Sequence, residues 1–447
     1  MSSTYFLELF NLDSLALVMV GLIGFIGLTV ASFSSRYLVG DAYYKKFFIL
    51  LFLLVASLMT LVCADHFALF FTAWVISNLL LVKLMIYKSL WRAAKASGDL
   101  TLKTFSIGFG SLLAAFIMIF ATTGLTSIRA ITQSQEFFPE MVLLLLLILI
   151  AAMTQSAIWP FHRWLISSLN SPTPVSAIMH AGLVNGGGLL LVRFAPLYSQ
   201  LPDLMTLIFV IGMTSAMLGT LWKLMQTDVK RMLACSTMGQ MGFMLAQIGL
   251  GLFPAAIAHL YWHGMFKAYL FLASGSAAQE KRLDLSYPPC TISLLEALLG
   301  GLMGCVCFVL VAHLDPFILD TTLIQILLAF LVTSQLALPI VHDRPVRNLP
   351  LALLTTGLMG GLYGASFYLM EIVLAPLNLM HPQPLNLFHW LGMFILVGSW
   401  LALLFGQNVI KKKGIQPTIQ RLYVKAFNAS QPQPETITVY RKDYRYK

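Results

Sequence analysis

One stretch of the chain, residues 159–193, reads WPFHRWLISSLNSPTPVSAIMHAGLVNGGGLLLVR. It places two histidines, a backbone interrupted by prolines and a run of three glycines within strongly apolar surroundings. Ionisable groups are costly in hydrocarbon, so in a membrane protein they face the bundle interior or a hydrated path. Non-helical backbone at membrane depth is tolerated only where protein or a water-filled cavity covers it. The stretch therefore predicts a broken membrane helix beside a proton or ion pathway.

The break itself has several recognisable elements. Trp159-Pro160 is expected to end one helix, and residues 159–174 to form a re-entrant or surface half-helix between two spans. Ser171 is expected to cap the next helix, with proline inside its first turn. The glycines permit close helix packing, and local unwinding is the other role open to them. The expected elements of the broken helix are Pro160, Pro172, Pro174, Gly186, Gly187 and Gly188.

The composition places the whole chain in a membrane. Of its 447 residues, 58% are hydrophobic and 10% are charged, and the mean hydropathy is +0.82. No soluble domain of this size buries so much apolar surface, whereas each transmembrane helix needs about 20 apolar residues. The first apolar run has no basic segment before it and no convincing cleavage site, so it is expected to be a retained helix.

Thirteen apolar runs follow one another along the chain. They predict an all-α, polytopic membrane protein with about 13 transmembrane helices, within a range of 12–14. Residues 1–407 are expected to form the transmembrane domain and residues 408–447 a basic cytoplasmic tail. The runs cover residues 12–31, 47–63, 67–87, 104–122, 141–158, 175–192, 204–224, 232–252, 254–278, 291–312, 322–341, 351–374 and 387–407.

The net charge of +10 does not indicate nucleic-acid binding, because the basic residues lie in short loops between apolar runs and in the tail. Alternate loops are basic, as the positive-inside rule requires. We therefore expect a multi-pass membrane protein with its N-terminus outside and its C-terminus in the cytoplasm. The basic loops contain Arg36, Lys45 and Lys46; Lys88, Arg92, Lys95 and Lys103; Arg163; Lys230 and Arg231; Lys281 and Arg282; and Arg344 and Arg347. The other loops contain Asp65; Arg129, Glu136 and Glu140; Asp203; Asp315 and Asp320; and His381.

Titratable side chains inside the apolar runs are the candidates for ion movement. His259, His263 and Lys267 are spaced i, i+4 and i+8, so they share one helix face, with about 6 Å between successive residues along the axis. Histidine exchanges a proton near neutral pH, and His180 lies in the broken stretch. These four residues are the principal candidates for a proton or ion pathway. The alternative is a set of interhelical hydrogen bonds that only holds the bundle together.

Two more lysines are candidates for the pathway. Lys223 lies inside its apolar run, and Lys83 lies four residues before the end of its run. For Lys83, extension of the side chain to the membrane interface is an equally good explanation. Glu296 and Glu371 are weaker candidates, each explained by a local ion pair.

The chain contains no signature of covalent catalysis or of a cofactor. The glycine run lacks the Lys-Ser/Thr of a phosphate-binding loop, and no metal-ligand spacing stands out. Five cysteines are irregularly spaced, and Cys305-x-Cys307 is better explained as helix packing than as a redox or metal pair. We expect no catalytic residue, no metal site and no cofactor in this chain, and therefore a transporter subunit and not an enzyme.

Three segments carry a family resemblance. They read PTPVSAIMHAG (172–182), TDVKRMLACSTMGQMGFM (227–244) and HLYWHGMFKAYLFLASGS (259–276). They resemble the antiporter-like membrane subunits of respiratory complex I and of Mrp cation/proton antiporters. Two further segments, WPFHRWL (159–165) and HAGLVNGGGLLLVRFAPL (180–197), are most similar to the DabB-type membrane subunits of DAB inorganic-carbon transporters.

The DabB resemblance implies a partner and a function. Such subunits pair with a large peripheral zinc-containing, carbonic-anhydrase-like subunit of the DabA type. Proton or Na⁺ influx through the membrane subunit would drive one-way conversion of CO2 to bicarbonate in that partner. Any zinc is therefore expected in the partner subunit.

The sequence departs from the complex I and Mrp pattern at a charged pair. Those subunits carry a glutamate after a tryptophan and a lysine before Ser-Ala, whereas this chain has Val75 and Gln155 at the matching positions. The departure favours an inorganic-carbon uptake subunit over a complex I or Mrp antiporter subunit, which remains the alternative. A third hypothesis is a non-conducting scaffold that anchors a peripheral protein.

Overall fold

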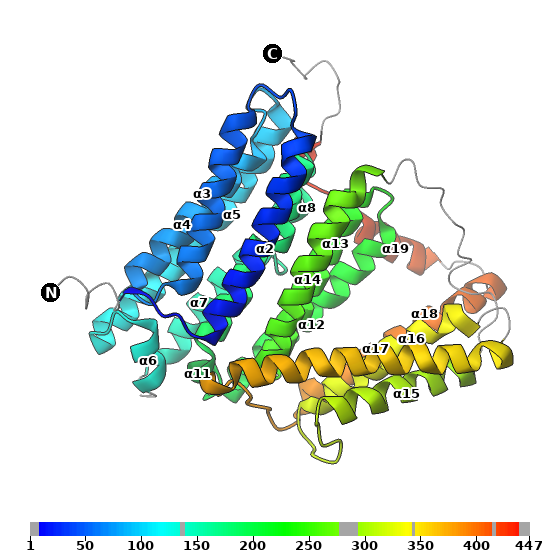
Figure 1. Ribbon diagram of the computed structural model, residues 1–447. Coiled ribbons are helices and arrows are strands. Elements are labelled where there is room, and N and C mark those ends of the chain that lie inside the picture. Colours follow the sequence, from blue (N-terminus) through cyan, green and yellow to red (C-terminus); the bar gives the residue numbers. More distant parts are fainter. Residues whose placement is uncertain (1–8, 135–138, 277–293, 342–344, 414–416, 438–447) are drawn as a thin grey trace. The chain divides into compact units, whose positions relative to one another are not determined.

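The computed structural model describes residues 9–134, 139–276, 294–341, 345–413 and 417–437 (Figure 1). These residues form helices and turns, and their only strand-like pairings are isolated bridges, such as that between Leu252 and Met380. The predicted all-α class is therefore confirmed. Some positions discussed above lie outside the described ranges: Glu136, residues 277–293 with Lys281, Arg282 and Cys290, Arg344, and the last residues of the tail, 438–447.

Each of the thirteen apolar runs coincides with helix in the described residues. The helices are α2 (Ser14–Tyr37), α3 (Tyr44–Cys63), α4 (Phe67–Met85), α5 (Arg92–Thr123), α7 (Met141–Gln155), α9 with α10 (Thr173–Ala181 and Gly186–Arg193), α12 (Pro202–Met225), α13 (Val229–Gly249), α14 (Phe253–Ala273), α15 (Leu294–Val311), α16 (Thr322–Val341), α17 (Pro345–Leu374) and α18 (Leu387–Lys413). Shorter elements connect them: α6 (Ile128–Ser134), α8 (Arg163–Ile166), α11 (Ala195–Tyr198), α19 (Pro417–Ala429), and 3-10 turns η1 (Leu183–Asn185), η2 (Ser274–Ser276), η3 (Ala375–Leu377) and η4 (Pro434–Thr436).

Ten of these spans, counted over the described residues, are long and apolar enough to cross a membrane. The other three are α7, which has 15 residues, and α13 and α14, which have 21 residues each. α13 and α14 fall outside the ten in spite of their length, and they carry the polar side chains described below. A search by hydropathy alone thus passes over helices that hold the candidate pathway residues.

Two helices, α5 and α17, begin well before the apolar runs that predict them. α5 has 32 residues and begins at Arg92, and α17 has 30 residues and begins at Pro345. A hydrocarbon core of about 30 Å is crossed by about 20 helical residues. Backbone hydrogen bonding continues past the apolar region, so hydropathy marks the membrane-embedded part and not the helix ends.

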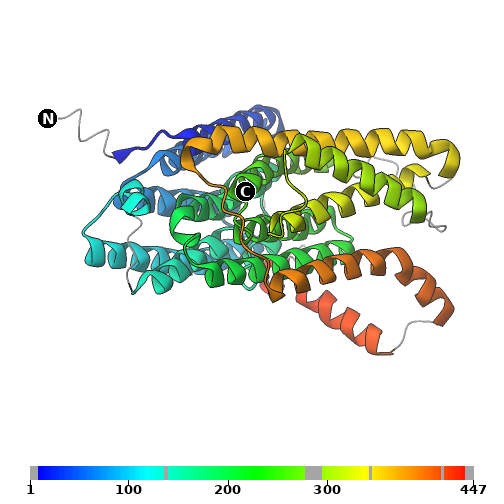
Figure 2. The same ribbon diagram turned by 90° about the horizontal axis from the view of Figure 1, so that it is seen from below.

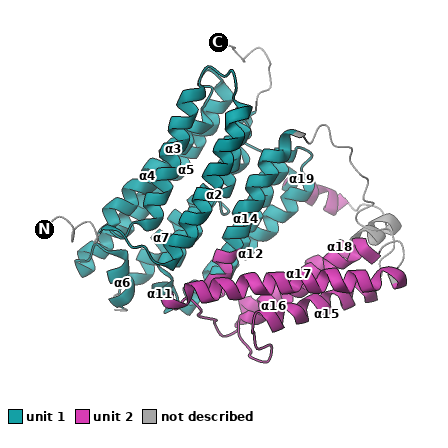
Figure 3. Cartoon of the chain, viewed as in Figure 1, with its two compact units in different colours: residues 1–248, 259–279, 426–447 teal, residues 249–258, 280–425 magenta. Residues whose placement is uncertain are grey.

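The chain divides into two compact units (Figure 3). Unit 1 contains residues 1–248, 259–279 and 426–447, and unit 2 contains residues 249–258 and 280–425. Within unit 2, α15 packs against both α16 and α17, and the three helices lie side by side (Figures 1 and 2). Gly364 allows this approach, because a Cβ there would lie 2.8 Å from the Phe308 carbonyl oxygen. The predicted division into a transmembrane domain, residues 1–407, and a cytoplasmic tail, residues 408–447, stays a prediction.

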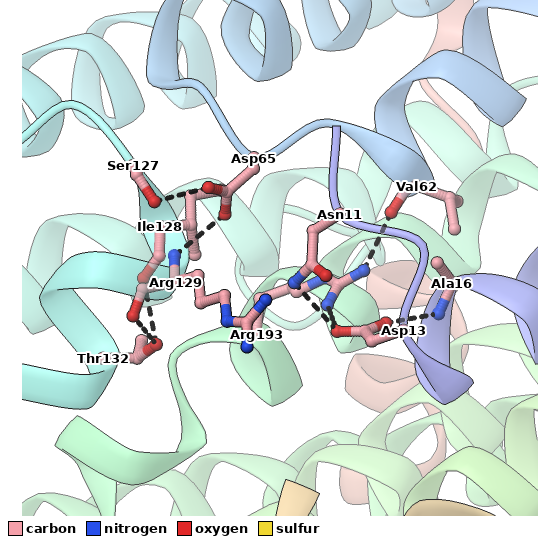
Figure 4. A network of polar contacts seen from close by, with 10 residues as sticks. All are labelled: Asn11, Asp13, Ala16, Val62, Asp65, Ser127, Ile128, Arg129, Thr132 and Arg193. Carbon is pink, nitrogen blue, oxygen red and sulfur yellow. Dashed lines mark hydrogen bonds and ion pairs between the residues drawn. The ribbon is translucent and has the colours of Figure 1, made fainter. Parts of the chain in front are cut away.

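A polar network joins three helices at one end of unit 1 (Figure 4). Asp13 caps α2 by accepting a hydrogen bond from Ala16 N at 2.8 Å, and it forms an ion pair with Arg193 at the end of α10. Arg193 Nη2 also donates to the Val62 carbonyl of α3 at 2.9 Å. Beside this group, Asp65 accepts hydrogen bonds from the Ser127 hydroxyl and from Arg129 N. Two of the loops predicted to share the less basic side, those with Asp65 and Arg129, therefore meet at this end.

The C-terminal strap, residues 430–436, docks on other loops of unit 1. Thr173 and Arg193 begin and end one span, so the strap contacts the loop at the opposite end of that span from the network of Figure 4. The loops that hold the strap belong to the basic set, which also contains Arg163 and Lys230. The hydrogen bonds join Asn170 to the Thr436 carbonyl (2.6 Å), Gln433 N to the Ser167 hydroxyl (3.1 Å), Gln226 to the Ser430 hydroxyl (2.8 Å) and Arg231 to Gln431 (3.1 Å).

Candidate functional site

The span that contains His180 is interrupted, as residues 159–193 predict. α9 ends at Ala181, the 3-10 turn η1 follows, and α10 begins at Gly186. The interruption therefore lies just before the three glycines and not within them. Glycine at position 182 follows the last residue of α9, and the chain narrows into the tighter 3-10 geometry before helix resumes.

Side chains of α7 and η1 satisfy the backbone groups that the interruption frees. Gln155 Nε2 donates to the Leu183 carbonyl at 3.2 Å, and the Ser156 hydroxyl donates to the Val184 carbonyl at 2.7 Å. Asn185 Nδ2 donates to the Ala181 carbonyl at 2.8 Å. An unpaired carbonyl in hydrocarbon costs several kcal/mol, so these bonds allow a broken helix at membrane depth.

The three glycines pack the restarted helix against its neighbours. A Cβ at Gly187 would overlap the Ala152 carbonyl and the Ser156 hydroxyl of α7. On the other side, a Cβ at Gly188 would lie 2.8 Å from Leu260 Cδ1 of α14 and would overlap the Met244 sulfur of α13. The glycines thus provide close helix packing, the first of the two roles considered for them.

The segment before the break is a loop with one short helix. α7 already ends at Gln155, and the Trp159-Pro160 peptide bond is cis. Trp164 of α8 anchors the segment by donating to the Thr154 carbonyl at 3.0 Å. The segment is a connection with a single short turn of helix, α8, between two spans.

The prediction that Ser171 caps the next helix is wrong. The N-cap of α9 is Pro172, and Pro174 lies in the first turn as expected. The Ser171 hydroxyl is buried and has no hydrogen-bond partner among the described residues. Two prolines near the start already remove N–H donors that a cap would satisfy.

The structure brings three of the predicted pathway residues into the interior of unit 1. The side chains of His180, His263 and Lys267 are 1%, 5% and 1% exposed, respectively. α14 approaches α9 closely at Gly264, where a Cβ would lie 2.9 Å from the Ala181 carbonyl oxygen. His259 is partly buried, and its ring centroid lies 6.0 Å from that of His263, with the rings stacked.

Thr237 of α13 connects His180 with Lys267, and the sequence interpretation did not single it out. His180 Nδ1 lies 3.0 Å from the Thr237 hydroxyl, which also lies 3.0 Å from the Leu233 carbonyl. Lys267 Nζ donates to the same carbonyl at 3.1 Å. The hydroxyl therefore lies between a histidine and the carbonyl that binds the buried ammonium group. Thr237 lies within the segment 227–244 that carries the family resemblance, and this was the feature of the sequence that could have pointed to it.

The two remaining predicted lysines lie at the surface, and Lys223 is within electrostatic range of Lys267. Lys83 and Lys223 are both exposed on the surface of the described structure, each two residues before its helix ends, at Met85 and Met225. That placement favours the interfacial explanation for both side chains, because a lysine near a helix end can extend its ammonium group to the membrane surface. A place in the interior of the pathway is not supported for either.

A neutral amide pair includes Gln155, one of the two positions of the missing charged pair. Gln155 is 2% exposed, and its Oε1 accepts a hydrogen bond from Asn78 Nδ2 of α4 at 2.9 Å. Asn78 lies one helical turn after Trp74 and Val75, and it was not predicted from the sequence. The pair carries no charge, so this part of unit 1 has no titratable switch between α4 and α7.

A second histidine of the quoted stretch is also buried. His162 is 4% exposed, its ring centroid lies 4.9 Å from that of Trp222, and neither ring nitrogen has a hydrogen-bond partner among the described residues. No three His, Cys, Asp or Glu side chains in the described ranges are placed to hold a metal ion together.

Two protein families match the chain. The family described as NADH:quinone oxidoreductase/Mrp antiporter, TM matches residues 64–298, and the family of the complex I chain 5 N-terminus matches residues 9–48. Residues 64–298, matched by the first family, contain the interrupted span of α9 and α10, and Thr237 of α13. They also contain the three titratable residues of α14, His259, His263 and Lys267.

Individual relatives fall within the same group. The probable inorganic carbon transporter subunit DabB of Bacillus anthracis is 41% identical over 275 residues, which are 60% of this chain and 54% of that protein. NADH-quinone oxidoreductase subunit L of Pseudomonas aeruginosa PAO1 is 34% identical over 274 residues, or 59% of this chain and 44% of that protein. The chain spans about half the length of these relatives.

A solved structure has a related fold. A chain in the structure of the Mrp complex from Dietzia sp. DQ12-45-1b superposes with a TM-score of 0.57 at 25% sequence identity, covering 95% of this chain and 45% of that one. Together with the relatives above, this match confirms the predicted resemblance to DabB subunits within the complex I and Mrp superfamily. Because residues 64–298 are more than half of its length, the chain belongs to the NADH:quinone oxidoreductase/Mrp antiporter transmembrane family.

Proposed function

We propose that this chain is the membrane subunit of an energy-coupled inorganic-carbon uptake complex. It conducts protons or Na⁺ inward, and this flow drives conversion of CO2 to bicarbonate in a large peripheral zinc-containing, carbonic-anhydrase-like partner of the DabA type. The 41% identity to a probable inorganic carbon transporter subunit supports the proposal. This chain supplies ion movement, and the hydration chemistry belongs to the partner.

The interior cluster of unit 1 is the observation that carries the proposal. It consists of His180, Thr237, His263 and Lys267, with His259 beside it. Imidazoles and hydroxyls can both donate and accept a proton, and buried ionisable groups in membrane proteins mark ion paths. Helix packing does not need several ionisable side chains in the interior, and such residues are typical of ion paths, which favours conduction over a purely structural role.

The proposed complex lies in the bacterial cytoplasmic membrane. The N-terminus is outside, the C-terminus is in the cytoplasm, and the partner binds the cytoplasmic face. The positive-inside rule supports this orientation. The strap also docks on loops of the basic set, so the C-terminal residues and those loops share one end of unit 1.

The second candidate function is an antiporter-like subunit of a complex I or Mrp assembly. The similarity to subunit L and to the Mrp complex structure favours it. The Gln155–Asn78 pair argues against it, because two neutral amides cannot replace a titratable glutamate–lysine pair. Redox or Mrp subunits encoded next to this chain would favour the second candidate.

Co-expression with the zinc partner in a cell that lacks carbonic anhydrase tests the leading proposal. The pair is expected to restore growth in ordinary air, and restored growth is expected to fail with an uncoupler, with Na⁺ removal, or with both. Zinc is expected to co-purify with the complex and to reside in the partner. Growth that survives both treatments would overturn energised uptake.

Variants of the same complex separate conduction from scaffolding. His259→Ala combined with Lys267→Ala is expected to abolish growth in air while the complex still assembles. Lys83→Ala is the matched control, since this lysine is exposed, and it is expected to retain growth. Full growth of the double variant would support a non-conducting scaffold.

A further inference from the structure

The short helix α19 (Pro417–Ala429) separates its side chains into two faces. With about 3.6 residues per turn, apolar and polar positions fall on opposite sides of the helix. The apolar face carries Ile419, Leu422, Tyr423 and Phe427, and the polar face carries Arg421, Lys425 and Asn428.

The apolar face of α19 is not covered by the parts of the chain that the structure describes. None of its residues is buried, and Leu422 and Ile419 are 61% and 46% exposed. A contiguous exposed apolar face marks a surface that another apolar phase covers. The backbone at the C-terminal end of the helix is capped, because the Ser430 hydroxyl donates a hydrogen bond to the Phe427 carbonyl at 2.6 Å.

The sequence around α19 places it at the surface of a membrane. α18, which precedes it, is among the helices long and apolar enough to span a bilayer, and only residues 414–416 separate the two. Residues 408–434 contain five basic residues, Lys411, Lys412, Lys413, Arg421 and Lys425, and no acidic residue. This charge is complementary to anionic headgroups.

The far end of α19 leads directly into the C-terminal strap. Ser430 is 1% exposed and is held by Gln226, and the following residues are bonded to the loop that contains Ser167 and Asn170. The C-terminal end of α19 is therefore anchored at the basic end of unit 1, which the positive-inside rule assigns to the cytoplasmic headgroup region.

We propose that α19 binds the surface of an anionic phospholipid leaflet. Its apolar face enters the boundary between headgroups and acyl chains, and Arg421 and Lys425 contact lipid phosphates. Aromatic residues such as Tyr423 and Phe427 are typical of this depth. A protein partner is the less favoured occupant, because the apolar face, the basic charge and the preceding span all match one lipid surface. The proposal stands apart from the transported ion and from the zinc partner.

Photo-crosslinking in the full-length protein tests this placement. A benzophenone amino acid replaces Leu422 on the apolar face, and Asn428 on the polar face is the matched control. Each protein is reconstituted without other subunits, either in phosphatidylglycerol with phosphatidylethanolamine or in phosphatidylcholine alone. We expect lipid adducts from position 422 and few from position 428. If the protein with the probe at position 422 does not accumulate, Ile419 is the second position.

The basic residues supply a separate measurement. In the mixed bilayer, Arg421→Gln with Lys425→Gln is expected to reduce phosphatidylglycerol adducts at position 422 about tenfold, because each basic residue near the surface adds to the attraction. Little change is expected in phosphatidylcholine. The proposal is overturned if position 422 forms no lipid adduct. It is also overturned if, in a second reconstitution that includes the zinc partner, position 422 crosslinks only to that subunit.

Discussion

Thr237 supplies the link between the two titratable helices at the level of single residues. Its hydroxyl contacts His180 Nδ1 and the Leu233 carbonyl, and that carbonyl also binds Lys267 Nζ. The hydroxyl can therefore orient the imidazole and exchange a proton with it, whereas the carbonyl can only accept hydrogen bonds. The geometry makes α13 part of the site, although it carries none of the predicted pathway residues.

Replacing Thr237 with valine tests this link. The change keeps the side-chain shape but leaves His180 Nδ1 without its partner, which costs about 1–3 kcal/mol when the group is buried. We expect uptake of inorganic carbon by the reconstituted complex to fall about tenfold or more, because the imidazole loses the hydroxyl that orients it and exchanges a proton with it. Thr237→Ser retains the hydroxyl and is expected to retain most of the uptake. Equal loss in both variants would indicate a packing role only.

Arg193 has a structural role at the other end of the same span. It pairs with Asp13 and donates to the Val62 carbonyl, with both charged side chains largely shielded from solvent. Arg193→Met leaves Asp13 unpaired, and we expect the free energy of unfolding to fall by about 3 kcal/mol. Thermal unfolding of the purified protein measures this, and Arg36→Met, at an exposed position, is the control. A shift no larger than that of the control would contradict the assignment.

At the scale of elements, the broken span depends on backbone packing between α7 and α10. Gly187→Ala would force a methyl group against the Ala152 carbonyl, which belongs to a rigid helix. We expect destabilisation of about 2–4 kcal/mol, in the range of overpacked or strained sites. Gly21→Ala is the matched control, since a Cβ there meets nothing within 4 Å, and it is expected to stabilise by about 0.5–1 kcal/mol. Similar effects of both changes on thermal unfolding would contradict the packing argument.

The strap is the second element whose attachment is testable. Asn170 Nδ2 donates to the Thr436 carbonyl at 2.6 Å, so Asn170→Ala removes one of its anchors at a cost of about 1 kcal/mol. We expect faster cleavage after Glu435 by a glutamate-specific protease, with the spanning helices unchanged. Asn428→Ala, in the exposed part of α19, is the control. Unchanged cleavage would show that the remaining contacts suffice.

At the scale of the whole molecule, the described loops of unit 1 that join the network and the strap lie at opposite ends of that unit. One set of these loops contains the network of Figure 4, and the other contains the strap and its basic neighbours. A fluorescent protein fused to the C-terminus is expected to fluoresce, and alkaline phosphatase fused at Glu140 is expected to be active, because the enzyme needs the oxidising side of the membrane. The reverse pattern would contradict the proposed orientation.

The predicted membrane class and the helix positions were largely accessible from the sequence, because apolar runs of about 20 residues have few alternatives to a spanning helix. The predicted shared face of His259, His263 and Lys267 follows from helical periodicity alone. Helix ends were less accessible: α5 extends well before its apolar run, and Ser171 is not a cap. Those features depend on local hydrogen bonding that hydropathy does not measure.

The sequence by itself thus determined the all-α membrane class, the family and the approximate spans. It also determined that His259, His263 and Lys267 share one helix face. Each of these depends on composition, periodicity or the local order of residues. Only the tertiary structure decided that Thr237 joins His180 to the Lys267 site, that Asn78 pairs with Gln155, and that Lys83 and Lys223 are exposed. These contacts join residues far apart along the chain. They are set by the rotation and approach of whole helices, and no short-range pattern of residues encodes that geometry.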